Sequence, residues 1–130
     1  MEQQSKNILL VEDDRFLRKA AEATLRRHGF IVRTAADGEE ALQRVRDEVP
    51  DLVLLDLIMP KLQGFEVLRI LKQDPATKQI PVVVLSNLGQ DSDVQQALQG
   101  GAAAYFIKAN LSLQDLVTQV QRVLTGGTAS

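Results

Sequence analysis

The sequence contains no cysteine among its 130 residues. This absence excludes disulfide bridges and thiolate metal sites, and it agrees with a reducing compartment. Long apolar runs are also missing, because none approaches the roughly 20 residues that a helix needs to cross a bilayer. Residues 1–7 are polar and lack the apolar stretch of a secretory signal. We therefore expect a cytoplasmic protein that does not insert into a membrane.

Concentrated positive charge is not a feature of the composition either. Fifteen Lys and Arg stand against 17 Asp and Glu, for a formal net charge of −2. Because contacts with nucleic-acid phosphates need clustered Lys and Arg, this balance argues against direct binding of nucleic acid. No glycine-rich loop of the Gly-x-x-x-x-Gly-Lys or Gly-x-Gly-x-x-Gly kind follows an expected strand, which argues against nucleotide binding.

The length fits one domain with one core, which buries roughly 65–70% of the surface that the unfolded chain exposes. We expect a single domain over residues 1–130, with its core at about 6–124 and a flexible tail at 125–130. We expect no output domain after this tail.

Five short apolar segments are typical of β-strands. Residues 7–11, 52–55 and 82–85 are nearly continuous runs of Val, Leu and Ile, the pattern of strands buried on both faces. Residues 31–35 are interrupted by polar side chains and residues 104–107 form a short run. These two segments suit the edges of a sheet, where one side meets water.

Segments with helical periodicity lie between and after these strands. The first ends at Gly29, which can form a left-handed cap, and two others open on capping boxes. The segments are marked by Phe16 to Leu25, by Asp37 with Glu40 and the closing Pro50, by Phe65, Leu68 and Leu71, by Ser92 to Gln99, and by Ser112 with Asp115 and the stripe Leu113, Leu116, Val117, Val120 and Leu124.

Strand and helix thus alternate five times along the chain. This alternation predicts an α/β fold with right-handed crossovers and a parallel sheet covered by helices on both faces. Ligands of such folds bind beyond the carboxyl ends of the strands. The residues that follow each strand are therefore the candidates for a functional site.

Polar side chains gather at the ends of four of the five expected strands. Carboxylates brought close together repel and raise one another's pKa unless a cation joins them. Magnesium meets this need, because it prefers oxygen ligands and is commonly held by one or two carboxylates plus a phosphate. A carboxylate can also attack phosphorus and form an aspartyl-phosphate. The residues in question are Glu12-Asp13-Asp14, Asp56, Ser86-Asn87 and Lys108.

Four motifs in this order resemble the signatures of response-regulator receiver domains, and the resemblance spans Lys6 to Leu124. It implies a flavodoxin-like (β/α)5 fold with strand order 2-1-3-4-5. It also implies a phosphorylation-dependent signalling switch of a two-component system and not an enzyme. The motifs are Ile-Leu-Leu-Val-Glu-Asp-Asp at 8–14, Leu-Leu-Asp-Leu-Ile-Met-Pro at 54–60 with Gly64, Val-Leu-Ser at 84–86, and Tyr-Phe-Ile-Lys at 105–108.

The resemblance implies partners, a cofactor and a role for each site residue. A sensor histidine kinase or phosphotransfer protein would supply the phosphoryl group, Mg²⁺ would be the cofactor, and a downstream protein would receive the signal. Asp56 would be the phosphoacceptor; Glu12, Asp13, Asp56 and the Ile58 carbonyl would serve the metal; Ser86, Asn87 and Lys108 would contact the phosphoryl group; Ser86 and Tyr105 would form the switch; Ile58 and Leu88 would flank the hydrolytic water and tune dephosphorylation.

The sequence departs from the family pattern in three places. Ala109 follows the lysine where the family usually has proline with a cis bond, so the loop is expected to take a different shape. Asn87 is larger than the usual residue after the switch hydroxyl and could narrow access to Asp56. Residues 102–104 are alanines, where many DNA-binding regulators carry acidic residues of a charged dimer face. We therefore expect a monomer or a weak, phosphorylation-dependent dimer.

Alternative roles and functions stay open at this point. Asp14 fits a helix cap better than a metal ligand, and His28 fits a structural place at a helix end. The chain could be a degenerate receiver that acts as an interaction module without phosphorylation. A phosphohydrolase of the haloacid dehalogenase type is less favoured, because its second acid would fall at Ile58.

Overall fold

The computed structural model describes residues 5–126 and shows one five-stranded parallel sheet in the order β2-β1-β3-β4-β5. This confirms the predicted α/β fold and strand order, with the two interrupted or short strands at the edges. The elements are β1 (Asn7–Val11), α1 (Arg15–Arg27), β2 (Ile31–Ala35), α2 (Gly38–Asp47), β3 (Leu52–Leu55), α3 (Gly64–Gln73), β4 (Val82–Ser86), α4 (Asp91–Gln99), β5 (Ala104–Ile107), a 3-10 turn η1 (Lys108–Asn110) and α5 (Leu113–Leu124).

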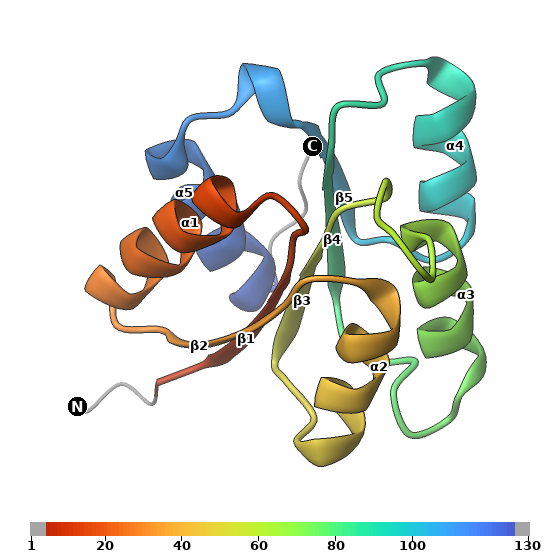
Figure 1. Ribbon diagram of the computed structural model, residues 1–130, viewed down its shortest axis with the longest axis horizontal. Coiled ribbons are helices and arrows are strands. Elements are labelled where there is room, and N and C mark those ends of the chain that lie inside the picture. The colour runs from red at the N-terminus through yellow and green to blue at the C-terminus, as the bar shows by residue number, and fades with distance from the viewer. Residues whose placement is uncertain (1–4, 127–130) are drawn as a thin grey trace.

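Helices cover both faces of the sheet, α1 and α5 on one side and α2, α3 and α4 on the other (Figure 1). Successive strand residues point to opposite faces, so each central strand contributes to two cores. Leu9 and Val11 of β1 lie in the core under α2 and α3, whereas Ile8 and Leu10 lie in the core under α1 and α5. This explains why the central strands are apolar at every position.

The helix ends follow the expected chemistry with one difference. Ser112 and Asp115 form a complete capping box at α5, as predicted. At α2 the Asp37 side chain accepts a hydrogen bond from the Glu40 N–H, but the Glu40 carboxylate accepts from the Ala36 N–H and not from that of Asp37. The Glu40 carboxylate therefore ties α2 to the residue just after β2.

Two further caps agree with the sequence. Gly29, just after α1, has a φ of +93°, in the left-handed region that favours glycine. Asp14 caps the start of the same helix, because its carboxylate accepts a hydrogen bond from the Leu17 N–H at 3.1 Å. Asp14 thus has the capping role that its position suggested.

Gly64, which accompanies the motif at 54–60, allows a close approach between α3 and the backbone after β3. A Cβ at this position would lie 2.3 Å from the Asp56 carbonyl oxygen, so the first turn of α3 packs directly on the backbone after β3. The left-handed residue of this loop is Lys61, with a φ of +67°. The absence of a side chain at Gly64 therefore keeps α3 against the segment that carries Asp56.

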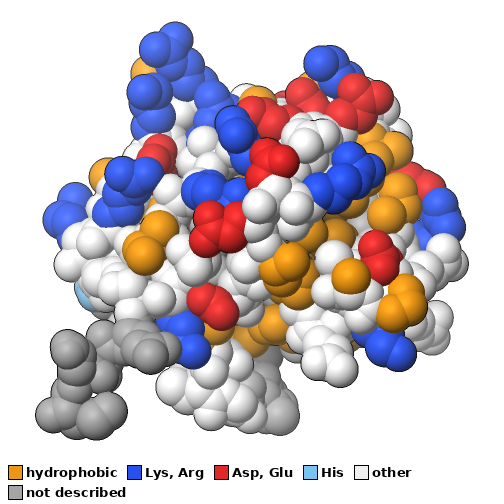
Figure 2. Space-filling model, turned by 90° about the horizontal axis from the view of Figure 1, so that it is seen from below, with side chains coloured by type: hydrophobic (Ala, Val, Ile, Leu, Met, Phe, Trp, Pro, Cys, Tyr) orange, Lys and Arg blue, Asp and Glu red, His pale blue; other side chains and the backbone are white. Residues whose placement is uncertain are grey.

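Charged side chains are unevenly distributed among the helices. The sequence of α1 has five Lys or Arg and one Glu, whereas α4 has two Asp and no Lys or Arg. On the face shown in Figure 2, Lys and Arg gather mainly at one side and hydrophobic side chains are exposed at the other. In the part of the chain that the structure describes, no helix is long and apolar enough to span a bilayer. The tail predicted to be flexible lies outside the described residues from position 127 onward.

Candidate functional site

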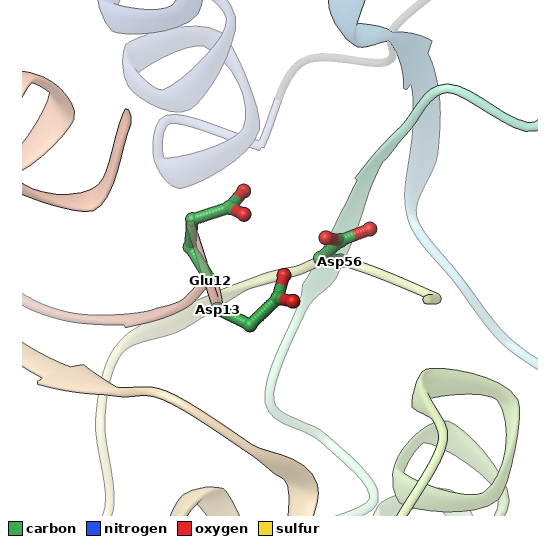
Figure 3. Close-up of side chains that lie close together, drawn as sticks. All are labelled: Glu12, Asp13 and Asp56. Atoms are coloured by element: carbon green, nitrogen blue, oxygen red, sulfur yellow. The ribbon is translucent and has the colours of Figure 1, made fainter. Parts of the chain in front are cut away.

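Three carboxylates meet at the carboxyl edge of the sheet. Glu12 and Asp13 follow β1 and Asp56 follows the neighbouring β3, because Val11 and Leu55 are partners in the parallel register. Oxygen atoms of the three side chains lie within 4.8 Å of one another (Figure 3). The structure therefore brings together the acidic residues that the sequence predicted at one edge.

Two of these carboxylates are almost completely buried. Glu12 is 2% exposed and Asp56 is 5% exposed, whereas Asp13 is open to solvent. A buried charge is costly unless a partner compensates for it. The partner is Lys108, whose Nζ lies 2.7 Å from Glu12 Oε1 and 2.9 Å from Asp56 Oδ2. One ammonium thus bridges the ends of β1 and β3 from the end of β5.

The pKa values reflect this arrangement. Burial raises the pKa of the Glu12 carboxyl, and the hydrogen bond from Lys108 offsets only part of that rise. Burial alone would lower the pKa of Lys108, but hydrogen bonds to Glu12 and Asp56 and the charges of both outweigh it and raise the pKa. Lys108 consequently stays protonated at neutral pH and serves as a fixed positive charge.

Main-chain groups hold the two buried carboxylates in place. The Ile58 N–H donates to Asp56 Oδ1 at 3.2 Å, and the Asp14 N–H donates to Glu12 Oε2 at 3.0 Å. Each carboxylate therefore has one oxygen bonded to the backbone and one bonded to Lys108. The loops after β1 and β3 thus fix the direction of both carboxylates.

The donor set fits a hard divalent cation. Three carboxylates facing one ammonium leave an excess of negative charge, and all the nearby ligand atoms are oxygens. Magnesium is commonly bound by few carboxylates and several waters, which suits a cluster open on the side of Asp13. Glu12, Asp13 and Asp56 are the side chains that could hold it, and the Ile58 carbonyl remains a predicted further ligand.

Ser86 and Tyr105 both contact the backbone of Leu88, in the loop between β4 and α4. The Ser86 Oγ, fully buried, accepts a hydrogen bond from the Leu88 N–H at 3.2 Å. The Tyr105 hydroxyl donates to the Leu88 carbonyl at 2.6 Å, and burial raises the pKa of this phenol. Tyr105 is therefore tied to the loop and does more than pack at the edge of the sheet. No sequence pattern indicates these bonds, because their partners are main-chain atoms.

The remaining predicted residues lie around this center with fewer contacts. Ile58 is 56% exposed, while Leu88 is half-buried and packs against the core that lies under α2 and α3. The Asn87 side chain is exposed and makes no hydrogen bond to other described residues. No peptide bond from residue 5 to residue 126 is cis, so the bond before Ala109 is trans, and Lys108 still reaches both carboxylates.

Comparison with known proteins identifies the family. The family model of the response regulator receiver domain matches residues 8–121 of this chain. The chain belongs to this family. A receiver domain is a signalling phosphoacceptor of two-component systems, not a catalytic enzyme, and it implies a kinase partner. The acidic cluster of this chain is typical of the magnesium site of a receiver domain.

Individual relatives agree with the assignment. A putative response regulator from Chloroflexus aurantiacus is 33% identical, with a TM-score of 0.87 over 94% of this receiver domain and 99% of that chain. A chemotaxis response regulator of Vibrio cholerae is 28% identical, with a TM-score of 0.86 over 92% and 99%. A gliding motility regulatory protein of Myxococcus xanthus is 40% identical over 116 residues, which are 89% of this chain and 15% of that protein. The chain spans at most half the length of such curated relatives.

The bridging position of Lys108 leads to a prediction about stability. We expect Lys108→Met to lower the free energy of unfolding by about 3 kcal/mol in a chelator, because two buried carboxylates lose their counter-ion. Saturating magnesium should restore part of the loss, since a divalent cation can replace the ammonium. Urea unfolding with chelator and with magnesium measures both quantities.

Lys61→Met is the matched control for this experiment. Its Nζ lies 3.7 Å from Asp37 and its own side chain is 62% exposed, so the contact is worth no more than about 1 kcal/mol. Equal losses in the two variants, or no recovery with magnesium in the Lys108 variant, would contradict the role of Lys108 as counter-ion.

Proposed function

We propose that Asp56 accepts a phosphoryl group from a histidine kinase or phosphotransfer protein, with Mg²⁺ held by Glu12, Asp13, Asp56 and the Ile58 carbonyl. The observation that carries this proposal is the setting of Asp56. Its buried carboxylate lies between the Ile58 N–H and the Lys108 ammonium, beside the two acids that follow β1. We further propose that the receiver domain acts in the cytoplasm and signals to a downstream protein, as a monomer or a weak, phosphorylation-dependent dimer.

Transfer of the phosphoryl group to Asp56 depends mainly on the position of the carboxylate and on positive charge near the phosphoryl oxygens. A carboxylate oxygen of Asp56 attacks the phosphorus, a new P–O bond forms, and the bond to the donor nitrogen breaks. When bound, magnesium supplies positive charge for the phosphoryl oxygens and for the acid cluster. Lys108 stays near Asp56 and stabilises the same oxygens, because its ammonium is already 2.9 Å from the acceptor.

The acceptor is tested by phosphorylation with acetyl phosphate and magnesium. We expect intact-mass measurement to show one added phosphate in the unmodified chain and none in Asp56→Asn. Asp14→Asn is the matched control, because asparagine keeps the helix cap and Asp14 lies outside the acid cluster, so it should be labelled normally. Equal labelling of Asp56→Asn would sink the proposal, and absence of labelling in every variant would favour a degenerate receiver.

We also propose that Ser86 and Tyr105 form the switch. Ser86 bonds to the N–H of Leu88 and Tyr105 bonds to its carbonyl, so both hold the same residue of the loop before α4. If the Ser86 hydroxyl turned toward a phosphoryl group on Asp56, its bond to Leu88 would be lost. The phosphoryl group would then shift an existing equilibrium of this loop, because it makes the Ser86 contact in one state only.

This switch predicts how far a signal travels from Asp56. On addition of beryllofluoride and magnesium, NMR chemical-shift changes should extend through Ser86 and Tyr105 to α4. In Tyr105→Phe, which lacks the hydroxyl, changes at Ser86 should persist while those at α4 shrink by about half or more, since a lost hydrogen bond weakens only the later step. Changes confined to the neighbours of Asp56 in the unmodified chain would refute the coupling.

We propose in addition that the phosphorylated form is long-lived. A hydrolytic water must approach in line with the bond to Asp56, past Ile58 and Leu88. Both side chains are apolar, so neither can orient the water or take its proton. The exposed Ile58 lies two residues after Asp56, while Leu88 also packs against the core.

Polar groups at these positions should therefore speed the loss of phosphate. We expect Ile58→Asn with Leu88→Glu to increase the decay rate about 10-fold, equivalent to about 1.4 kcal/mol of barrier. Decay of the phosphoprotein is followed after removal of the donor, with saturating magnesium and with each single variant alongside. Urea unfolding first establishes that Leu88→Glu remains folded. A rate equal to or below that of the unmodified chain would defeat the argument.

A haloacid-dehalogenase-type hydrolase is the less favoured alternative. Such an enzyme needs a second acid two residues after the nucleophile, and here that position is the exposed Ile58. Turnover of a generic phosphate ester would support the alternative, and its absence would agree with a phosphoacceptor.

A further inference from the structure

The β2 strand forms one edge of the sheet, and within residues 5–126 its one partner strand is β1. The Ile31 N–H donates to Lys6 and the Ala35 carbonyl accepts from Glu12, so residues 31 and 35 turn their main-chain groups toward the neighbouring strand. The direction of the main-chain N–H and C=O groups alternates along a strand. Those of Val32 and Thr34 therefore point away from β1, at the open edge of the sheet. Their carbonyls are the groups that an added strand would use.

Arginine side chains cover both of these outward carbonyls. Arg26 Nη2 donates to the Val32 carbonyl at 2.8 Å, and Arg44 Nε donates to the Thr34 carbonyl at 3.3 Å. An unpaired edge is a template for pairing with another chain, and proteins commonly protect such edges with charged side chains. Here the protection is a specific bond to each outward acceptor of the strand.

The two arginines approach the edge from opposite faces of the sheet. Arg26 belongs to α1 and Arg44 to α2, which lie on the two sides of β2 (Figure 1). Each is held by a glutamate one helical turn earlier in the same helix. Arg26 lies 2.9 Å from Glu22, and Arg44 lies 3.1 Å from Glu40. The guanidinium groups are thereby directed toward the strand and not left free in solvent.

A third arginine ties α2 to the same edge. Arg33 of β2 donates to the carbonyls of Arg44 and Glu48, at the carboxyl-terminal end of α2. Strand and helix therefore exchange bonds in both directions, from Arg33 to the helix backbone and from Arg44 to the strand backbone. This exchange keeps Arg44 over Thr34.

We propose that Arg26 and Arg44 close the β2 edge against pairing with β2 of a second copy of this chain. A second copy fits the edge because two antiparallel β2 strands related by a two-fold axis would place Val32 of one opposite Thr34 of the other. The outward donors and acceptors of the two strands would then match in number. Ile31, half exposed at the start of the strand, would add apolar contact. The arginines keep these acceptors occupied.

The test removes the two donors while keeping their hydrocarbon stems. In Arg26→Met with Arg44→Met, we expect analytical ultracentrifugation to show a monomer–dimer equilibrium at least about 10-fold tighter than in the unmodified chain, since each uncovered edge then offers two free acceptors. The matched control is Arg27→Met with Arg46→Met. It removes the same charge from nearby residues of the same helices, one position from Arg26 and two from Arg44. Neither control residue bonds to the β2 backbone, and the control should behave as the unmodified chain does.

Amide hydrogen exchange locates the contact. In the dimer of the double variant the Val32 and Thr34 N–H groups should become protected, because they bond across the new interface. The proposal is overturned if the folded double variant associates no more than the control, or if it dimerises while these two amides exchange as fast as before. Far-UV circular dichroism verifies the fold. If the double variant does not fold, Arg26→Met and Arg44→Met are measured singly against the same two criteria.

Discussion

The ion pairs of Lys108 with Glu12 and Asp56 are the interaction on which the rest of the site depends. Two carboxylates that are each almost fully buried need a nearby cation, and the Lys108 ammonium supplies it at 2.7 and 2.9 Å. A single positive charge leaves the cluster of three acids still negative, which favours a divalent ion. The ammonium that compensates for the two buried carboxylates is therefore also the positive charge beside Asp56, the phosphoacceptor proposed above.

The sheet supplies the rigidity that this arrangement requires. Apolar side chains on both faces of β1, β3 and β4 lock these strands between two helical layers. Their carboxyl ends cannot move independently, so the acids stay close together despite their repulsion. Gly64 adds to this constraint, because the missing Cβ lets α3 press on the backbone of Asp56.

Sequence patterns predicted the central strands and the acid cluster, because side-chain type alone determines both. Continuous apolar runs indicated the central strands, and parallel order then placed Glu12, Asp13 and Asp56 at one edge. The patterns failed where a backbone atom is the partner. The Glu40 carboxylate bonds to the Ala36 N–H, and Ser86 and Tyr105 share Leu88, but residue identity alone reveals none of these bonds. The left-handed backbone of Lys61 was not predicted either, since a positive φ is uncommon outside glycine and the lysine side chain gives no sign of it.

The two edge strands of the sheet, β2 and β5, differ in how firmly side chains hold them. At β5, Tyr105 makes one hydrogen bond to a loop, and the switch proposed above would exchange this contact at small cost. At β2, Arg26 and Arg44 bond to the strand from both faces, and glutamates hold each of them. A switch needs one edge that can rearrange, but the same freedom at the other edge would invite pairing between copies. In the switch proposed above, the rearrangement lies at β4, α4 and β5, on the side of the sheet away from the β2 edge that the two arginines cover.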